Sequence, residues 1–222
     1  MNRVAIIAVH PDDETLGCGG TILKHLANGD EVHWIIGTDI KESDGFSKSQ
    51  IKTRSDEIKS VNNMYGFNSF HELGLSTTKV DQYPISEIVL KISSIFNKIK
   101  PNIVYLPFSG DIHSDHQCLF NAAISCTKSF RYPFIRAIYM METISETEYA
   151  ANTKASVYSP NIFNDITEYM DKKIQIMYQY KSELGQHPFP RSERNIISLA
   201  TFRGASSGCE FAESFMLIKE IK

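Results

Sequence analysis

The hydrophobic positions of this chain follow two alternating patterns. Short runs of apolar and β-branched residues, such as residues 4–9 (VAIIAV), are typical of strands buried on both faces of a sheet. Longer segments carry an apolar residue at every third or fourth position, which is typical of helices with one buried face. In residues 84–100 this stripe consists of Ile85, Ile88, Val89, Ile92 and Ile95. We therefore expect strands and helices to alternate along the chain.

The pattern and its intervening turn residues give a set of expected elements. Strands are predicted over residues 4–9, 31–37, 69–73, 103–106, 135–141 and 215–218. Helices are predicted over residues 20–27, 48–64, 84–100, 115–130, 166–180 and 196–203. Ser47 is the expected N-cap of the second helix, and Asn28 with Gly29 is expected to end the first. Such alternation predicts an α/β fold: a single Rossmann-like domain over residues 1–222, with a mostly parallel sheet flanked by helices.

Composition and charge narrow the class of protein. With 222 residues, 42% of them hydrophobic and 22% charged, the chain is typical of a soluble globular enzyme. The net charge of −3 argues against a nucleic-acid partner. No apolar run approaches the roughly 20 residues that span a bilayer, and no secretory signal is visible. The four cysteines lack paired metal spacing, so reduced thiols and a cytoplasmic location are expected.

The first of two polar motifs directly follows the first predicted strand. His10, Asp12, Asp13 and Glu14 stand there, ahead of the glycine-rich residues 17–20 (GCGG). Ligands of open α/β sheets bind in the crevice past the carboxyl ends of the strands. The glycines lack the G-x-G-x-x-G spacing of a dinucleotide site, which disfavours a nucleotide-dependent oxidoreductase. We interpret them instead as allowing close approach of the backbone near a metal.

The second polar motif is residues 111–117 (DIHSDHQ), just past the predicted strand over residues 103–106. His113 and His116 are three residues apart, so both can face one side of a helix. A catalytic zinc takes three His or carboxylate ligands and leaves one position open. It lowers the pKa of a bound water, and a free carboxylate can then take the proton. Together the two motifs predict a metal-dependent site at one edge of the sheet.

The paired motifs resemble those of the LmbE-like or PIG-L family of zinc-dependent de-N-acetylases. The resemblance rests on residues 8–14 (AVHPDDE) and residues 113–116 (HSDH). It extends over nearly the whole chain, to Arg54 with Glu57, residues 73–75 (LGL), Arg203 with Gly204, and residues 211–215 (FAESF). It implies a hydrolase that removes the N-acetyl group of an amino sugar, which would be free, nucleotide-linked or part of a glycoconjugate.

The resemblance also implies a role for individual residues. The implied zinc ligands are His10, Asp13 and His116. Asp12 matches the general base, and His113 matches the residue that stabilises the oxyanion or protonates the leaving amine. Asp115 would orient His113 or His116, and Arg54 would meet a sugar hydroxyl or phosphate. Some members carry a tyrosine where this chain has Asp111, so what replaces it is open. Fe²⁺, Co²⁺ or Mn²⁺ would also suit such a site.

Several of these residues also have simpler structural interpretations. Asp12 or Asp13 could cap the following helix, and Asp115 could be the N-cap of its own. Three residues are candidate substrate contacts: Arg54, Glu57 and Arg191. The first two could instead form a surface ion pair. Cys18 and Cys118 flank the motifs but are expected to be small buried thiols. Four isolated histidines are expected to be structural or on the surface: His25, His33, His71 and His187.

Two other functions fit the same motifs. An amidase of a sugar-linked thiol conjugate would use the same chemistry on another substrate. A protein that binds a metal or a nucleotide-sugar without turnover would not need an unligated carboxylate such as Asp12. The sequence leaves open which small-molecule amino sugar is used, what it is attached to, and whether the chain forms a homo-oligomer.

Overall fold

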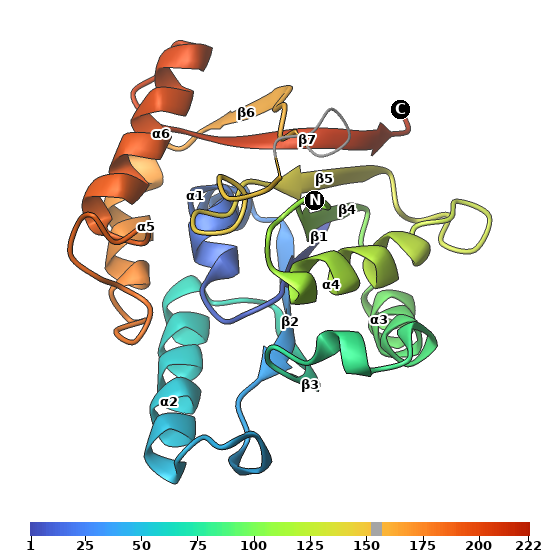
Figure 1. Cartoon of the computed structure of the whole chain (residues 1–222). Helices are drawn as coiled ribbons and strands as arrows, with labels where there is room; N and C mark the ends of the chain where they lie inside the picture. Colours follow the sequence, from blue (N-terminus) through green and yellow to red (C-terminus); the bar gives the residue numbers. More distant parts are fainter. Residues whose placement is uncertain (152–156) are drawn as a thin grey trace.

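The structure, a computed structural model, describes residues 1–151 and 157–222 and is built around a seven-stranded sheet (Figure 1). The strands are β1 (Arg3–Ala8), β2 (Glu31–Asp39), β3 (Ser69–Ser76), β4 (Ile103–Pro107), β5 (Ala137–Met141), β6 (Ile162–Asp165) and β7 (Ala212–Glu220). Their order across the sheet is β3-β2-β1-β4-β5-β7-β6. The first five are parallel, whereas β7 runs antiparallel to both β5 and β6. The expected α/β fold with a mostly parallel sheet is therefore confirmed.

Helices cover both faces of the sheet, with one apolar core on each side. They are α1 (Asp13–Ala27), α2 (Lys48–Tyr65), α3 (Ile85–Ile99), α4 (Ser114–Ser125), α5 (Met170–Met177) and α6 (Glu193–Ser207). One core joins α1, α2, α5 and α6 to the sheet around Trp34, which is fully buried as expected. The other core joins α3 and α4 to the opposite face around Phe96 (Figure 1).

This arrangement opens a crevice between two neighbouring strands. The chain leaves β1 into α1 on one face of the sheet and leaves β4 into α4 on the other face. Because β1 and β4 are parallel neighbours, their carboxyl ends lie side by side where the two helices diverge. Such a switch point is where open α/β sheets bind their ligands.

Several predicted element boundaries differ from the structure. Helix α1 begins at Asp13 rather than at residue 20, and it is kinked at Cys18, whose φ of −150° is not helical. Helix α4 ends at Ser125, before the predicted end at residue 130. The expected helix over residues 166–180 is a 3₁₀ turn followed by the shorter α5. Strand β6 was not predicted, because its four residues show no clear alternation.

Other local predictions hold. Ser47 caps α2, accepting the amide of Gln50 in a complete capping box. Gly29, with a φ of +77°, provides the left-handed turn after α1. The apolar stripe of α3 is shifted, however. Ile88, Ile92 and Phe96 are buried, whereas Ile85 is 52% exposed because it lies in the first turn of the helix.

The glycines of α1 serve helix packing rather than approach to a metal. A Cβ atom on Gly20 would lie 2.6 Å from the Cβ of Ile166, and one on Gly19 would lie 2.8 Å from the hydroxyl of Tyr65. Neither glycine lines the cavity described below. Gly17, where a Cβ would lie 3.0 Å from Sδ of Met141 in β5, does not line it either. The interpretation of these glycines as metal-proximal is therefore wrong: Gly19 and Gly20 let α1 pack closely against α2 and the segment before α5.

Candidate metal centre and active-site pocket

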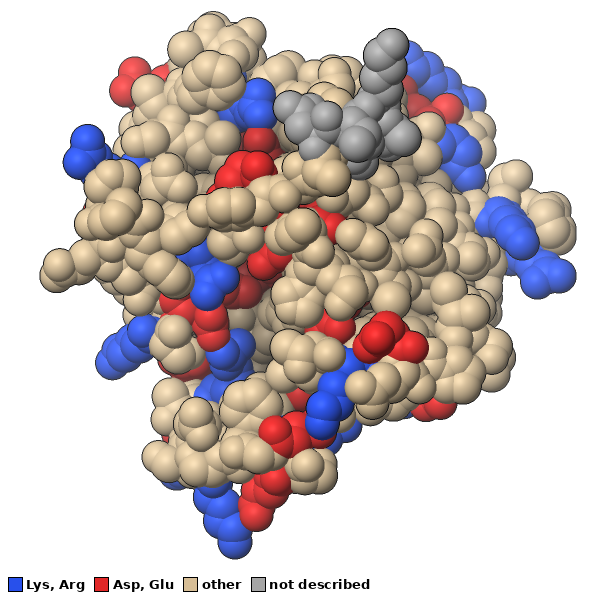
Figure 2. Space-filling view, in the orientation of Figure 1, with Lys and Arg blue, Asp and Glu red and all other residues tan. Residues whose placement is uncertain are grey.

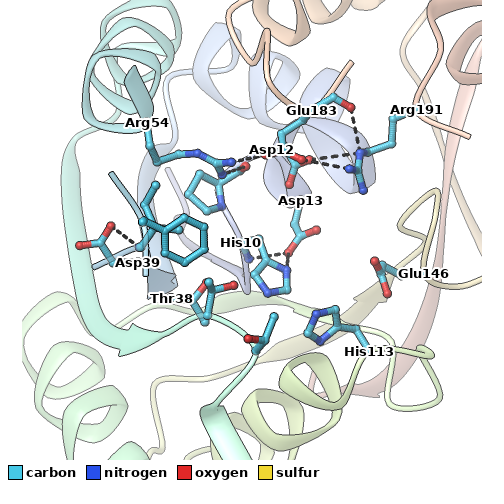
Figure 3. A pocket seen from close by; sticks show the side chains of 15 residues that line it. His10, Asp12, Asp13, Thr38, Asp39, Arg54, His113, Glu146, Glu183 and Arg191 are labelled. Atoms are coloured by element: carbon cyan, nitrogen blue, oxygen red, sulfur yellow. Dashed lines mark hydrogen bonds and ion pairs between the residues drawn. The ribbon is translucent and has the colours of Figure 1, made fainter. Parts of the chain in front are cut away.

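The two polar motifs meet at the carboxyl ends of β1 and β4 (Figure 3). His10 follows β1, Asp13 is the first residue of α1, and His116 lies in the first turn of α4. One ligand atom from each of these three residues lies within 4.8 Å of the other two. The structure thus brings together the three predicted ligands from segments far apart in the sequence.

The donor atoms of this triplet fit a metal ion. The Nε2 atom of His116 is buried without a hydrogen-bond partner among the described residues, although Oδ2 of Asp13 lies 3.3 Å away. The same oxygen lies 3.8 Å from Nδ1 of His10 and accepts the backbone amides of Val9 and His10. Burial alone would raise the pKa of Asp13, but attraction to His116 and His10 lowers it below its usual value. An orphaned nitrogen facing a fixed carboxylate is an arrangement that a cation would complete.

Each histidine of the triplet has a second carboxylate at its other ring nitrogen. Oδ2 of Asp111 lies 2.8 Å from Nδ1 of His116, and Oδ2 of Asp115 lies 3.3 Å from Nε2 of His10. Both aspartates are fully buried. Such outer partners fix the orientation of a ligating imidazole. They leave Nδ1 of His10 and Nε2 of His116 to face Asp13.

A second set of donors overlaps the first and consists of His10, His113 and Asp115. Its atoms already have partners. The Asp115 carboxylate accepts the backbone amides of Thr78 and Val80 at 2.6 and 3.1 Å. Oδ2 of Asp13 also accepts two amides, but the triplet of His10, Asp13 and His116 contains the buried Nε2 atom of His116, which has no hydrogen-bond partner among the described residues, and is therefore the better candidate for a metal centre.

Asp12 lies beside the triplet and belongs to neither donor set. Its φ of +134° is in a region that favours glycine, and such strained backbones cluster at functional sites. Burial and the nearby carboxylates of Asp13 and Glu183 raise the pKa of Asp12. It occupies the N-cap position of α1, yet its side chain makes no capping hydrogen bond. Helix capping therefore does not explain this carboxylate.

His113 is held in one tautomer by the start of α4. It is the N-cap residue, and its Nδ1 atom accepts the backbone amide of Asp115 at 3.1 Å. An acceptor nitrogen carries no proton, so the neutral ring bears its hydrogen on Nε2. Burial and the neighbouring His10 lower the pKa of His113, which favours this neutral form. The side chain is thus set up as a hydrogen-bond donor through Nε2.

His10, Asp12, Asp13 and His113 line a cavity of about 280 Å³, close to the lower end of the range of ligand pockets, ~300–1,000 Å³. Its wall also contains three acids, two cations and an aromatic ring: Asp39, Glu146, Glu183, Arg54, Arg191 and Phe46. Figure 2 shows acidic and basic side chains gathered around the hollowed middle of this face. A small polar ligand would therefore meet charged groups on several sides.

Comparison with known proteins places the chain in a family. The model of the PIG-L family, described as GlcNAc-PI de-N-acetylase, matches residues 5–127, which is more than half of the chain. The chain belongs to the PIG-L family. The diacetylchitobiose deacetylase of Thermococcus kodakarensis is 25% identical over 230 residues, covering 100% of this chain and 85% of the relative. A probable N-acetyl-alpha-D-glucosaminyl L-malate deacetylase 2 of Bacillus cereus is 24% identical, covering 82% of this chain and 83% of the relative.

The fold of this PIG-L chain is also found among solved structures. The N,N'-diacetylchitobiose deacetylase from Pyrococcus horikoshii, complexed with an inhibitor, superimposes with a TM-score of 0.78 at 22% identity. The match covers 98% of this chain and 84% of that one. Within the part of the chain that the structure describes, no helix is long and apolar enough to cross a membrane.

The structure corrects two expectations about the second motif of this PIG-L chain. Asp115 is not the N-cap of α4, because His113 takes that position and Asp115 lies inside the helix. Its carboxylate faces His10 rather than His116, and it contacts His113 through its backbone amide, with Oδ2 4.0 Å from Nδ1 of that ring. The partner of His116 is Asp111, which the sequence marked only as a departure from the family.

The candidate substrate contacts are placed differently from one another. Arg54 and Arg191 line the cavity, whereas Glu57 does not. Glu57 is buried behind Arg54, and its Oε2 atom lies 3.6 Å from Nε of Arg54. Sequence reasoning missed Glu183 and Glu146 as lining residues. Both lie in segments without a regular pattern, so nothing in the sequence pointed to them.

Proposed function

We propose that this chain is a metal-dependent hydrolase that removes the acetyl group from an N-acetylated amino sugar. The observation that carries the proposal is the position of Asp12. This buried carboxylate lies next to a His-Asp-His triplet, belongs to neither donor set and lines a small polar cavity. Relatives named as deacetylases of sugar substrates support the same reaction.

The metal would be held by His10, Asp13 and His116, and we propose zinc as the resident ion. When bound, it would polarise the acetamide carbonyl and make a water molecule more acidic. Two nitrogens and one carboxylate form a donor set that zinc shares with Fe²⁺, Co²⁺ and Mn²⁺.

Asp12 and His113 would act directly on the reacting atoms. Asp12 takes a proton from the attacking water as that water adds to the acetamide carbon. The Nε2–H group of His113 donates a hydrogen bond to the oxygen on which negative charge develops. The C–N bond then breaks, and Asp12 passes its proton to the departing amine, which its raised pKa favours. Acetate and a free amino sugar are the products.

Acetate release tests this proposal. Zinc-loaded protein is incubated with N-acetylglucosamine, N,N'-diacetylchitobiose and UDP-N-acetylglucosamine, and is compared with the variants Asp12→Asn and Asp171→Asn. Loss of a general base costs about 10²- to 10⁴-fold in rate, so Asp12→Asn should fall by that factor with its metal content unchanged. Asp171→Asn makes the same chemical change at an exposed position of α5 outside the cavity and should stay within a few-fold of wild type.

The outcome separates the alternative functions. Bound metal without acetate from any substrate would reject the deacetylase and favour an amidase of another conjugate or a binding protein. Failure to bind any of the four metals would contradict the assignment of the triplet. The expected cytoplasmic location and any homo-oligomer stay predictions.

A further inference from the structure

Glu183 bridges the two arginines of the cavity (Figure 3). Its Oε1 atom pairs with the guanidinium of Arg54, and its Oε2 atom lies 3.0 Å from Nη2 of Arg191. The backbone oxygen of Glu183 also accepts Nε of Arg191 at 3.0 Å. All three side chains are 15–22% exposed, so these ion pairs are largely shielded from water. Charge-assisted pairs in such surroundings are stronger than those on an open surface.

The other nitrogen atoms of the two guanidinium groups also have polar neighbours. Arg54 directs Nη1 to the backbone oxygen of Pro11 at 3.3 Å, and its Nε lies 3.6 Å from Glu57. Arg191 donates from Nη1 to Ser145 at 2.9 Å, while its Nε also lies 3.8 Å from Asp12. An incoming phosphate or carboxylate binds arginine through two parallel hydrogen bonds. Here it would have to displace Glu183 to find them.

The charge of the cavity opposes anions as well. The two arginines are outnumbered by five lining carboxylates: Asp12, Asp13, Asp39, Glu146 and Glu183. A phosphate or carboxylate beside the sugar would therefore lose its hydration without gaining a free cationic partner.

We propose that Glu183 determines substrate charge selectivity: by occupying Arg54 and Arg191, it makes the cavity accept uncharged N-acetyl sugars and reject those that carry an anionic group next to the sugar. This inference rests on the proposed deacetylase function. An anionic substrate is disfavoured because it must first break the ion pairs that Glu183 forms with the two arginines.

The test compares one neutral and one anionic substrate on the zinc-loaded enzyme. The probes are N,N'-diacetylchitobiose and N-acetylglucosamine 1-phosphate, and the readout is the ratio of their kcat/KM values. Glu183→Gln keeps the shape of the side chain but frees the arginine forks. We expect the wild type to prefer the neutral probe and Glu183→Gln to shift the ratio about tenfold toward the phosphate, as one charge-assisted hydrogen bond allows. Because the readout is a ratio, a loss of activity that affects both substrates equally does not change it.

Two control variants isolate the arginines. Asp39→Asn removes one negative charge from the same cavity, but no contact between Asp39 and either arginine is found among the described residues. Its ratio should shift much less than that of Glu183→Gln. In the double variant Glu183→Gln/Arg54→Gln, the gain toward the phosphate should largely disappear. Equal shifts in Asp39→Asn and Glu183→Gln would overturn the inference, because total charge rather than Glu183 would then set selectivity.

A binding measurement keeps this inference separate from the proposed reaction. Calorimetric titration of the zinc-loaded protein with N-acetylglucosamine and N-acetylglucosamine 1-phosphate needs no turnover. Tighter binding of the phosphate by Glu183→Gln than by wild type would support the selectivity even if no acetate were released. Acetate release from the neutral probe, with the same preference in wild type and Glu183→Gln, would reject the selectivity and leave the deacetylase standing.

Discussion

Asp111 and His116 form a buried pair in which Oδ2 of the aspartate lies 2.8 Å from Nδ1 of the imidazole. Both side chains are fully buried, and the other oxygen of Asp111 accepts the hydroxyl of Thr147 at 2.7 Å. The aspartate is therefore fixed from two sides and in turn fixes the ring. As a result, the unpartnered Nε2 atom of His116 points at Asp13.

Replacing Asp111 should weaken metal binding. Asp111→Asn keeps the size of the side chain but loses the charge that orients His116 and makes it more basic. Loss of such an outer partner typically costs about 10- to 100-fold in metal affinity. Competition for Zn²⁺ against a chelator of known affinity would measure the change, with Asp39→Asn as the control. Unchanged affinity in a folded Asp111→Asn protein would remove His116 from the proposed ligand set.

Replacing His113 should slow the reaction without releasing the metal. His113→Asn retains a side chain that can cap α4, since asparagine is a good N-cap, but it withdraws the Nε2–H donor from the cavity. Loss of one oxyanion donor costs about 10²- to 10³-fold in kcat. Steady-state kinetics and metal content, measured on the same preparations, would show this. A His113→Asn protein that lost its metal would instead indicate that the overlapping set of His10, His113 and Asp115 binds the ion.

The sequence could predict the fold and the centre of the site because both depend on local signals. Buried strands such as β1 and β4 are continuous apolar runs, and the polar motifs stand directly after them. Since neighbouring parallel strands end at the same edge of the sheet, this order alone placed His10 near His116. The start of α1 was predicted too late, because acidic residues such as Asp12 and Asp13 are as common in loops as in the first turn of a helix.

The wall of the cavity could not be predicted in the same way. Glu183 and Arg54 are 129 positions apart and meet only because the segment after α5 packs against the middle of α2. The pairing of Asp111 with His116 was also hidden, because a five-residue separation has no fixed geometry where a loop turns into a helix. These contacts depend on tertiary packing, which no local pattern records.

Two glycines of the same helix should respond differently to alanine. Gly20→Ala places a Cβ 2.6 Å from the branched Cβ of Ile166, whereas Gly17→Ala meets the flexible Sδ of Met141 at 3.0 Å. Overpacking against a rigid neighbour costs about 1–3 kcal/mol, while alanine regains up to ~1 kcal/mol of helix propensity. Urea unfolding should therefore show a clear loss of stability for Gly20→Ala and a smaller change for Gly17→Ala. The reverse order would contradict the packing role given to Gly20.

His33 should make the protein less stable as the pH falls. The residue is 8% exposed, its Nδ1 atom lies 2.8 Å from the hydroxyl oxygen of Ser69, and its Nε2 atom has no hydrogen-bond partner among the described residues. Burial lowers the pKa of His33 below its ordinary value of 6.5, with His71 and Arg3 adding to the effect against the opposing pull of Glu31. The unfolded chain therefore binds a proton more readily than the folded one, and stability falls as the pH drops through 6.5.

The measurement is the free energy of unfolding of the wild type and of His33→Gln at several pH values. The wild-type value minus the variant value should decrease as the pH is lowered from about 7 to 5. The exposed His187 supplies the control, since His187→Gln removes no buried ring, and a flat difference for His33→Gln would show that its burial does not oppose protonation.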